Sequence, residues 1–197
     1  PNKAWAKKMF PNLSPKQAMD KLWEYIMKSV RLDTENPVLE WEKHQERILN
    51  RCKILNDAKI DSFTYKNSLG TELTVGMPKG YIFCGGAENG ALDGIAFTAN
   101  LPTEEVFSCP DRNRVNGKVY SSMPLCVNGA IVNDFGFEFK DGRIVDFWAK
   151  EGYENLKNIV ETDDGSHYLG EIALVGYNSP IRNLNTLFYK TLFDENA

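Results

Sequence analysis

The spacing of apolar residues changes once along this chain, near residue 62, and that change restricts the folds open to it. Before it, apolar residues recur every four positions and form one stripe, as in an amphipathic helix: Ala18, Leu22, Ile26 and Val30. After it, apolar and polar residues alternate, first at Phe63 and Tyr65 and then at Leu73 and Val75. This period of two is typical of half-buried strands. Helices that pack on a sheet are therefore predicted, which is an α+β fold.

Two sequence signals mark the starts of two N-terminal amphipathic helices. Ser14-Pro15 and Asn36-Pro37 each place a capping side chain before a proline, whose missing N–H is no loss at the first helical position. The apolar side of the second helix is lined by Trp41, Ile48, Cys52 and Leu55. Charged residues crowd the same segment, so we expect His44 to be a solvated surface residue. Residues 1–60 are expected to form a helical segment, and residues 61–197 a β-rich part.

The β-rich part contains three dipeptides that are typical of hairpin turns: Asn116-Gly117, Asn128-Gly129 and Asp141-Gly142. Asparagine, aspartate and glycine tolerate the two positive φ angles of a type I′ turn. Strand-like runs accompany these turns at Lys118–Ser122, Gly129–Glu138 and Arg143–Ala149. Together they predict a largely antiparallel β-meander.

The remaining stretches give weaker signals. Gly80–Gly94 holds five glycines but matches neither GxGxxG nor GxxxxGK[ST], so it is predicted to be a loop of structural turns rather than a nucleotide cradle. A short helix is expected near Tyr153–Glu161 and a strand at Ile172–Val175, whereas Leu184–Phe193 could be strand or helix.

Charge and hydropathy exclude two classes of partner. The 23 basic and 27 acidic residues give a net charge of −4, so no cationic field is available to bind the phosphates of a nucleic acid. No apolar run approaches the roughly 18 to 20 residues that span a bilayer, so no membrane partner is expected. The cysteines form no CxxC pair, and we interpret them as reduced thiols of a cytoplasmic protein: Cys52, Cys84, Cys109 and Cys126.

The two histidines offer few catalytic arrangements. His44 and His167 are far apart in the sequence and form no HExxH zinc motif. His167 follows an acidic turn at the start of a predicted strand, and an imidazole there suits acid–base chemistry near neutral pH. A thiol hydrolase that pairs Cys84 or Cys109 with His167 is a weak alternative, because no flanking motif supports it.

Four glutamates stand beside apolar runs: Glu104, Glu105, Glu171 and Glu195. An ionised carboxylate that is buried without a partner is strongly destabilising, so each needs a cation or a proton. No basic partner is evident in the neighbouring sequence, which suggests a shared cation site. The alternative is that strand alternation turns each carboxylate to solvent, the commoner position for glutamate.

A family resemblance rests on the segments Asn100–Phe107, Gly170–Val175 and Leu187–Ala197, which carry these glutamates. They resemble the aminopeptidase T / aminopeptidase S family of dinuclear metalloaminopeptidases, also called thermophilic metalloproteases. The resemblance implies two divalent metal ions (zinc, cobalt, manganese or magnesium) bound by Glu105, Glu171 and Glu195, with Glu171 as the bridge. Glu104 is the candidate for a supporting role behind the ligands or for a catalytic base.

The same resemblance implies a metal-dependent aminopeptidase that releases N-terminal amino acids from peptides through a water activated by two metals, and a homodimer. The chain resembles an internal fragment of that family, truncated at both ends, with further ligands expected beyond Ala197. We therefore expect it to be inactive alone. The alternative is a non-catalytic, β-rich interaction or dimerisation module. Its candidate anchors are tryptophans that could equally pack in the core: Trp5, Trp23 and Trp41.

Overall fold

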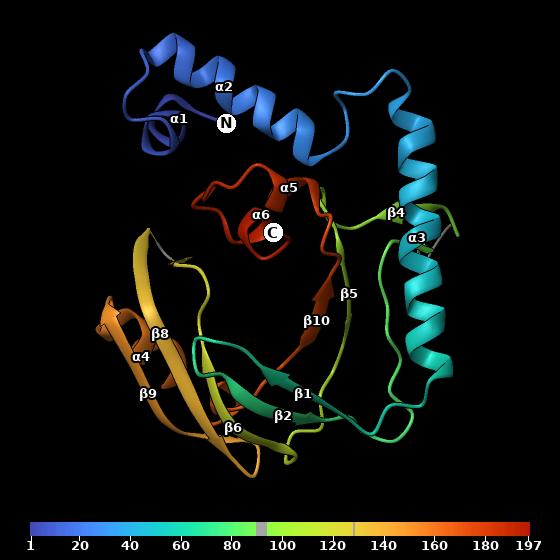
Figure 1. The fold of residues 1–197 in the computed structure, drawn as a ribbon, viewed down its shortest axis with the longest axis vertical. Helices are drawn as coiled ribbons and strands as arrows, with labels where there is room; N and C mark the ends of the chain where they lie inside the picture. Colours follow the sequence, from blue (N-terminus) through green and yellow to red (C-terminus); the bar gives the residue numbers. More distant parts are fainter. Residues whose placement is uncertain (90–93, 128) are drawn as a thin grey trace. The chain divides into compact units, whose positions relative to one another are not determined.

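The computed structural model describes residues 1–89, 94–127 and 129–197, and the chain divides into two compact units. Unit 1 consists of Pro1–Cys52, Cys84–Val106 and Leu174–Ala197. Unit 2 consists of Lys53–Phe83 and Phe107–Ala173. Figure 1 labels the elements, which combine N-terminal helices with antiparallel strands and so confirm the α+β class. None of the helices within the described ranges is long and apolar enough to cross a membrane.

Three helices open the chain, one more than the sequence predicted: α1 (Lys3–Met9), α2 (Pro15–Ser29) and α3 (Pro37–Asp57). The predicted starts of α2 and α3 are confirmed. At α2, the hydroxyl of Ser14 accepts the backbone N–H of Gln17, and the Gln17 side chain returns to the Ser14 backbone. Helix α1 was missed because seven residues give too few repeats to show a period, although Asn2 caps it by accepting the N–H of Trp5 at 2.8 Å.

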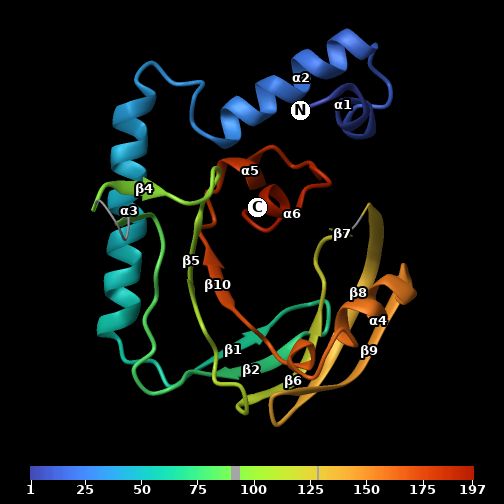
Figure 2. The same ribbon diagram turned by 180° about the vertical axis from the view of Figure 1, so that it is seen from behind.

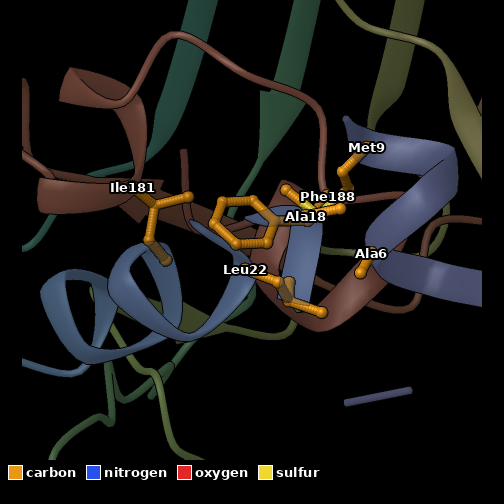
Figure 3. Close-up of a cluster of buried hydrophobic side chains, with 6 residues drawn as sticks. All are labelled: Ala6, Met9, Ala18, Leu22, Ile181 and Phe188. Atoms are coloured by element: carbon orange, nitrogen blue, oxygen red, sulfur yellow. The ribbon is translucent and has the colours of Figure 1, made fainter. Parts of the chain in front are cut away.

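The core of unit 1 joins the first two helices to the end of the chain. Its buried members come from α1, from α2 and from the segment around α5 (Pro180–Asn183): Ala6, Met9, Ala18, Leu22, Ile181 and Phe188. The ring of Phe188 lies in the middle of this cluster (Figure 3). Its carbonyl accepts the indole N–H of Trp5 at 2.5 Å. The first and last segments of unit 1 are therefore one packed body.

The last segment is mostly irregular. Leu184–Phe193 was expected to be strand or helix, but regular structure returns only in the short helix α6 (Thr191–Asp194). Several apolar residues of this stretch pack on the unit 1 core, among them Leu184, Phe188 and Phe193.

Unit 2 is built on one antiparallel sheet. Its strands are β1 (Ser62–Lys66), β2 (Glu72–Gly76), β6 (Val115–Tyr120), β7 (Leu125–Val127), β8 (Ala130–Lys140) and β9 (Arg143–Glu151). The order is β1-β2-β6-β8-β7, and β9 pairs with β8. Helix α4 (Tyr153–Val160) contacts β8 and β9 (Figure 2). Its side chains Leu156 and Val160 are buried. The predicted meander and the helix near Tyr153 are confirmed.

The three hairpin dipeptides behave differently. Asp141-Gly142 joins β8 to β9 with φ angles of +48° and +85°, as a type I′ turn requires. Gly129 precedes β8, while Asn128 lies outside the described residues. The prediction for Asn116-Gly117 is wrong, because both residues lie inside β6, where Gly117 pairs with Leu73. A Cβ at Gly117 would meet the carbonyl oxygen of Glu72 at 2.1 Å, so the glycine permits a close approach of β2 instead of a turn.

Four shorter strands complete the fold: β3 (Ala87–Asn89), β4 (Ala96–Thr98), β5 (Glu105–Ser108) and β10 (Ile172–Val175). The β3–β4 pair places a strand in the stretch that was predicted to be a loop, and residues 90–93 of that stretch lie outside the described residues. β10 has the predicted bounds and pairs with β5. His167 ends a 3-10 turn, η1 (Gly165–His167), rather than beginning a strand.

Candidate functional site

Three of the four predicted glutamates lie in unit 1. Glu104 immediately precedes β5, Glu105 is the first residue of β5, and Glu195 caps the C-terminus of α6. Glu171 lies in unit 2, directly before β10. Glu104 is buried and Glu105 half-buried, whereas Glu171 and Glu195 are exposed. Exposure was the alternative considered for all four, and it holds for only two of them.

Every polar group of Glu104 is bound within unit 1. Both carboxylate oxygens accept the guanidinium of Arg31, and the second of these bonds, Nη2 to Oε2, measures 2.8 Å. The backbone carbonyl accepts Nη1 of Arg51 at 3.2 Å, and the backbone N–H donates to Oδ1 of Asn196 at 2.7 Å. With only 3% of Glu104 exposed, the charge is neutralised by a fork-shaped ion pair. The sequence near Glu104 contains no basic partner, and the structure supplies one in Arg31, which follows the end of α2.

The bond between Glu104 and Asn196 brings two candidate ligands into neighbouring positions. Glu105 follows one of the bonded residues and Glu195 precedes the other, so each glutamate is one residue from this bond although 90 residues separate them in the sequence. Asn196 is fully buried, and its amide also donates to the carbonyl of Leu192 at 2.9 Å. Two carboxylates predicted to share a site are thus carried by adjacent segments.

The segment that carries Glu195 is fixed on its other side as well. The Asp194 carboxylate accepts the N–H groups of Phe188 at 2.7 Å and of Lys190 at 2.9 Å. Burial raises the pKa of Asp194, against the opposing effect of these bonds. The hydroxyl of Ser179 donates to the carbonyl of Asn196 at 2.6 Å. Glu195 therefore lies between two residues whose side chains are both held by the backbone of unit 1.

His44 is a second component of this buried network, and its predicted surface position is wrong. The residue is 0% exposed, and its Nε2 lies 2.7 Å from the carbonyl oxygen of Thr103 and 3.7 Å from Oε1 of Glu104. A carbonyl only accepts, so Nε2 carries the proton. Nδ1 is buried and has no hydrogen-bond partner among the described residues. Burial lowers the pKa of His44, although the nearby Glu104 charge opposes this.

Sequence reasoning missed Arg31 and His44, and only His44 left a signal. His44 lies three residues after Trp41 and four before Ile48, which is the spacing of the apolar stripe. The charged neighbours hid that spacing. Trp41 packs edge-on against the His44 ring, with centroids 5.4 Å apart. Arg31 gave no comparable signal, because its partner is 73 residues away.

Glu171 borders a hollow of about 360 Å³ within unit 2. Its apolar lining residues come from β2, β6, the start of β10 and the segment before it: Leu73, Val75, Val119, Leu169, Ile172 and Ala173. Lys66, Asn67 and Thr71 line it as well. Tyr65 and Ser122 add hydroxyl groups to the lining. Burial raises the pKa of Tyr65, so its hydroxyl stays protonated at neutral pH. The hollow offers room for an apolar side chain beside a carboxylate.

The donor atoms in unit 1 fit a divalent metal as a partial ligand set. Glu105 and Glu195 supply hard carboxylate oxygens on adjacent segments, the ligand type that zinc, manganese and magnesium accept. Within the described parts of the chain, no group of three or more His, Cys, Asp and Glu side chains gathers as a metal centre. The thiol alternative gains no contact either, since no hydrogen bond joins Cys109 to His167 in the described part of unit 2.

Comparison with known proteins covers the whole chain. Residues 1–197 match the model of the family described as thermophilic metalloprotease (M29). The chain is 43% identical over its full length to aminopeptidase 2 of Geobacillus stearothermophilus, and 45% identical over 98% of its length to aminopeptidase AmpS of Bacillus subtilis strain 168. It covers 47% of each of these proteins, so it spans about half the length of the curated relatives it matches.

A solved structure is similar to the chain throughout. Wild-type AmpT from Thermus thermophilus matches with a TM-score of 0.92 at 36% sequence identity, over 100% of this chain and 48% of that one.

Proposed function

Since the chain belongs to the thermophilic metalloprotease (M29) family, we propose that it contributes half of a metal-dependent aminopeptidase, which releases N-terminal residues from peptides. The observation that carries this proposal is the match of all 197 residues to that family, whose relatives are named aminopeptidases. The bond between Glu104 and Asn196 supports it, because that bond sets two oxygen-donor side chains on adjacent segments. Family membership implies a divalent metal cofactor.

We propose that Glu105, Glu171 and Glu195 bind the metal, in a centre of two ions. When bound, such ions polarise a peptide carbonyl and lower the pKa of a coordinated water. Each of the three glutamates would supply a carboxylate oxygen, the hard donor type that divalent ions accept. Glu104 has a supporting role rather than that of a base, because Arg31 occupies both of its oxygens.

The hollow beside Glu171 suits the side chain of a substrate's N-terminal residue. Its apolar walls come from two strands of the sheet and from β10, and the carboxylate of Glu171 stands among the lining residues. A side chain of leucine size would be removed from water when it enters the hollow. The resulting gain in binding free energy grows with the apolar area that is buried. We therefore propose a preference for apolar N-terminal residues.

The homodimer that the resemblance implies also stays a proposal. Of the three tryptophans considered as anchors, Trp5 and Trp41 donate hydrogen bonds inside unit 1, to the carbonyls of Phe188 and Val30. Trp23 is 44% exposed on α2 and is the one that a second copy could cover.

A metal-dependent assay tests the activity. The full-length protein should release p-nitroaniline from leucyl-p-nitroanilide when a divalent ion is supplied, and EDTA should abolish that release. The 197-residue chain alone should be inactive, because three carboxylates without further ligands repel one another. Metal-dependent turnover by the short chain would refute its expected inactivity, and its absence in the full-length protein would refute the aminopeptidase.

A further inference from the structure

We propose that the buried network around Glu104 holds the carboxylates of Glu105 and Glu195 in register for metal binding. Arg31, His44 and Asn196 are then positioning residues. This inference rests on the proposed function, because it assumes that Glu105 and Glu195 bind metal. It goes further by assigning a role to three residues that bear no metal-binding carboxylate.

The network fixes Glu104 from three separate elements of unit 1. Arg31 follows the end of α2 and binds the carboxylate, while Arg51 of α3 binds the backbone carbonyl. His44 of α3 holds the preceding carbonyl, that of Thr103, at 2.7 Å. A residue whose side chain and backbone are both hydrogen-bonded has little freedom to rotate. Glu105 is the next residue along the chain, so the restraint on Glu104 also limits its backbone. The network thus sets where β5 starts and how Glu105 is presented.

Asn196 extends this restraint to the second ligand. Its side chain accepts the N–H of Glu104 at 2.7 Å, and its carbonyl accepts the hydroxyl of Ser179 at 2.6 Å. On the other side of Glu195, Asp194 is anchored to the backbone at Phe188 and Lys190. Glu195 therefore has little backbone freedom relative to Glu105. Ligand pairs with fixed spacing bind metal more tightly, because less ordering accompanies binding.

The backbone at Arg31 is a second, independent indication. Its φ angle is +56°, at the position just after the C-cap Val30 of α2, where glycine is usual. Lys59 has a similar φ of +47° just after α3 but is exposed, whereas the side chain of Arg31 at this position binds the buried Glu104. Stability in general does not account for this ion pair, since buried ion pairs are a weak source of stability compared with apolar packing. A role of the Arg31–Glu104 ion pair in positioning Glu105 and Glu195 accounts better for an arginine at this position.

Calorimetric titration of Zn²⁺ into the metal-free full-length protein tests the inference without relying on turnover. Asn196→Ala removes the bond that joins the two segments and should raise the Kd for Zn²⁺ about 10-fold or more, within the range seen when partners of metal ligands are removed. Saturating metal should restore much of kcat. The matched control is Asn56→Ala, which breaks an equivalent pair of side-chain bonds to the backbone of Phe83 in unit 2 and should leave the Kd unchanged.

A second variant covers the case in which Asn196→Ala does not fold, as judged by circular dichroism. Arg31→Lys keeps the charge but loses the two-oxygen contact, and it should weaken Zn²⁺ binding several-fold. Folded variants at either position that bind Zn²⁺ as tightly as the wild type would overturn the positioning role and leave the aminopeptidase proposal standing. A wild-type protein that binds no Zn²⁺ would overturn both.

Discussion

His44 shows at the scale of one residue how burial and charge set a protonation state. Its neutral ring donates from Nε2 to Thr103, and its Nδ1 faces no acceptor among the described residues. Protonation would place a cation in the interior between the positive Arg31 and Arg47 and the negative Glu104. Burial outweighs the carboxylate, so the pKa lies below the ordinary 6.5.

This shift predicts how stability depends on pH. Because the folded pKa of His44 is lowered, the unfolded chain binds the proton more readily, and stability falls as pH drops below about 6.5 towards the folded value. Above that pH the contribution is complete. His44→Gln keeps a donor near Thr103 but does not titrate, so its urea midpoint should vary less between pH 5 and pH 7. An identical pH slope in the wild type and the variant would contradict this origin.

The residues of the buried network were missed in the sequence, whereas the candidate ligands were proposed from it and stay a prediction. Glu105, Glu171 and Glu195 lie in segments long enough to resemble a family. Arg31 and Asn196 act through partners 73 and 92 residues away, and no local pattern encodes such a distance. Only the helical spacing of His44 was readable, and its charged neighbours favoured the wrong interpretation.

At the scale of elements, prediction succeeded where a local sequence preference, such as apolar periodicity or a turn dipeptide, determined the structure. Helix α2 and strand β10 lie where the spacing of apolar residues predicted them. Asp141-Gly142 forms its turn because both residues tolerate the positive φ angles that the turn requires. The same logic failed at Asn116-Gly117, where pairing on both sides outweighs the preference for a turn. β6 lies between β2 and β8, so its glycine serves close packing.

Gly117→Ala should be one of the most damaging small changes in the sheet. A Cβ would stand 2.1 Å from the Glu72 oxygen, at a φ of +113°, and we expect a loss of roughly 2–4 kcal/mol in the free energy of unfolding. Gly80→Ala is the control, because its φ is also positive, at +75°, but nothing lies within 4 Å. It should cost about 1 kcal/mol. Urea denaturation measures both, and equal losses would show that the clash is relieved.

The start of β10 carries a prediction about substrate choice. Ala173 lines the hollow beside Glu171, so Ala173→Leu should fill part of it. The ratio of kcat/KM for leucyl over alanyl p-nitroanilide should fall about 10-fold in the full-length enzyme. Ala58→Leu makes the same change at an exposed position outside the hollow and should leave the ratio alone. Because the ratio is taken within one variant, partial misfolding cancels, and an unchanged ratio would remove the hollow from substrate selection.

At the scale of the whole molecule, the chain matches longer relatives and divides into two compact units. It covers about half the length of its relatives, and the predicted ligands are divided between its two units. Residues 1–60 as a helical segment and 61–197 as part of a catalytic domain remain a prediction.

The proposed homodimer can be tested at Trp23. If a second copy covers this side chain, Trp23→Ala should shift the full-length protein towards monomer in sedimentation velocity. Leu69→Ala, at a site that is 52% exposed between β1 and β2, is the control and should leave the distribution unchanged. Identical sedimentation of all three proteins would exclude Trp23 as an anchor.

The strained Arg31 and its buried partner also matter to protein engineers. Replacing a buried ion pair with well-packed apolar side chains of similar volume often stabilises a protein. Arg31→Met combined with Glu104→Met should therefore keep or raise the melting temperature while weakening Zn²⁺ binding. A heat-based selection that ignores metal affinity would tend to erase this pair, so evolved thermostable variants should be screened for both properties.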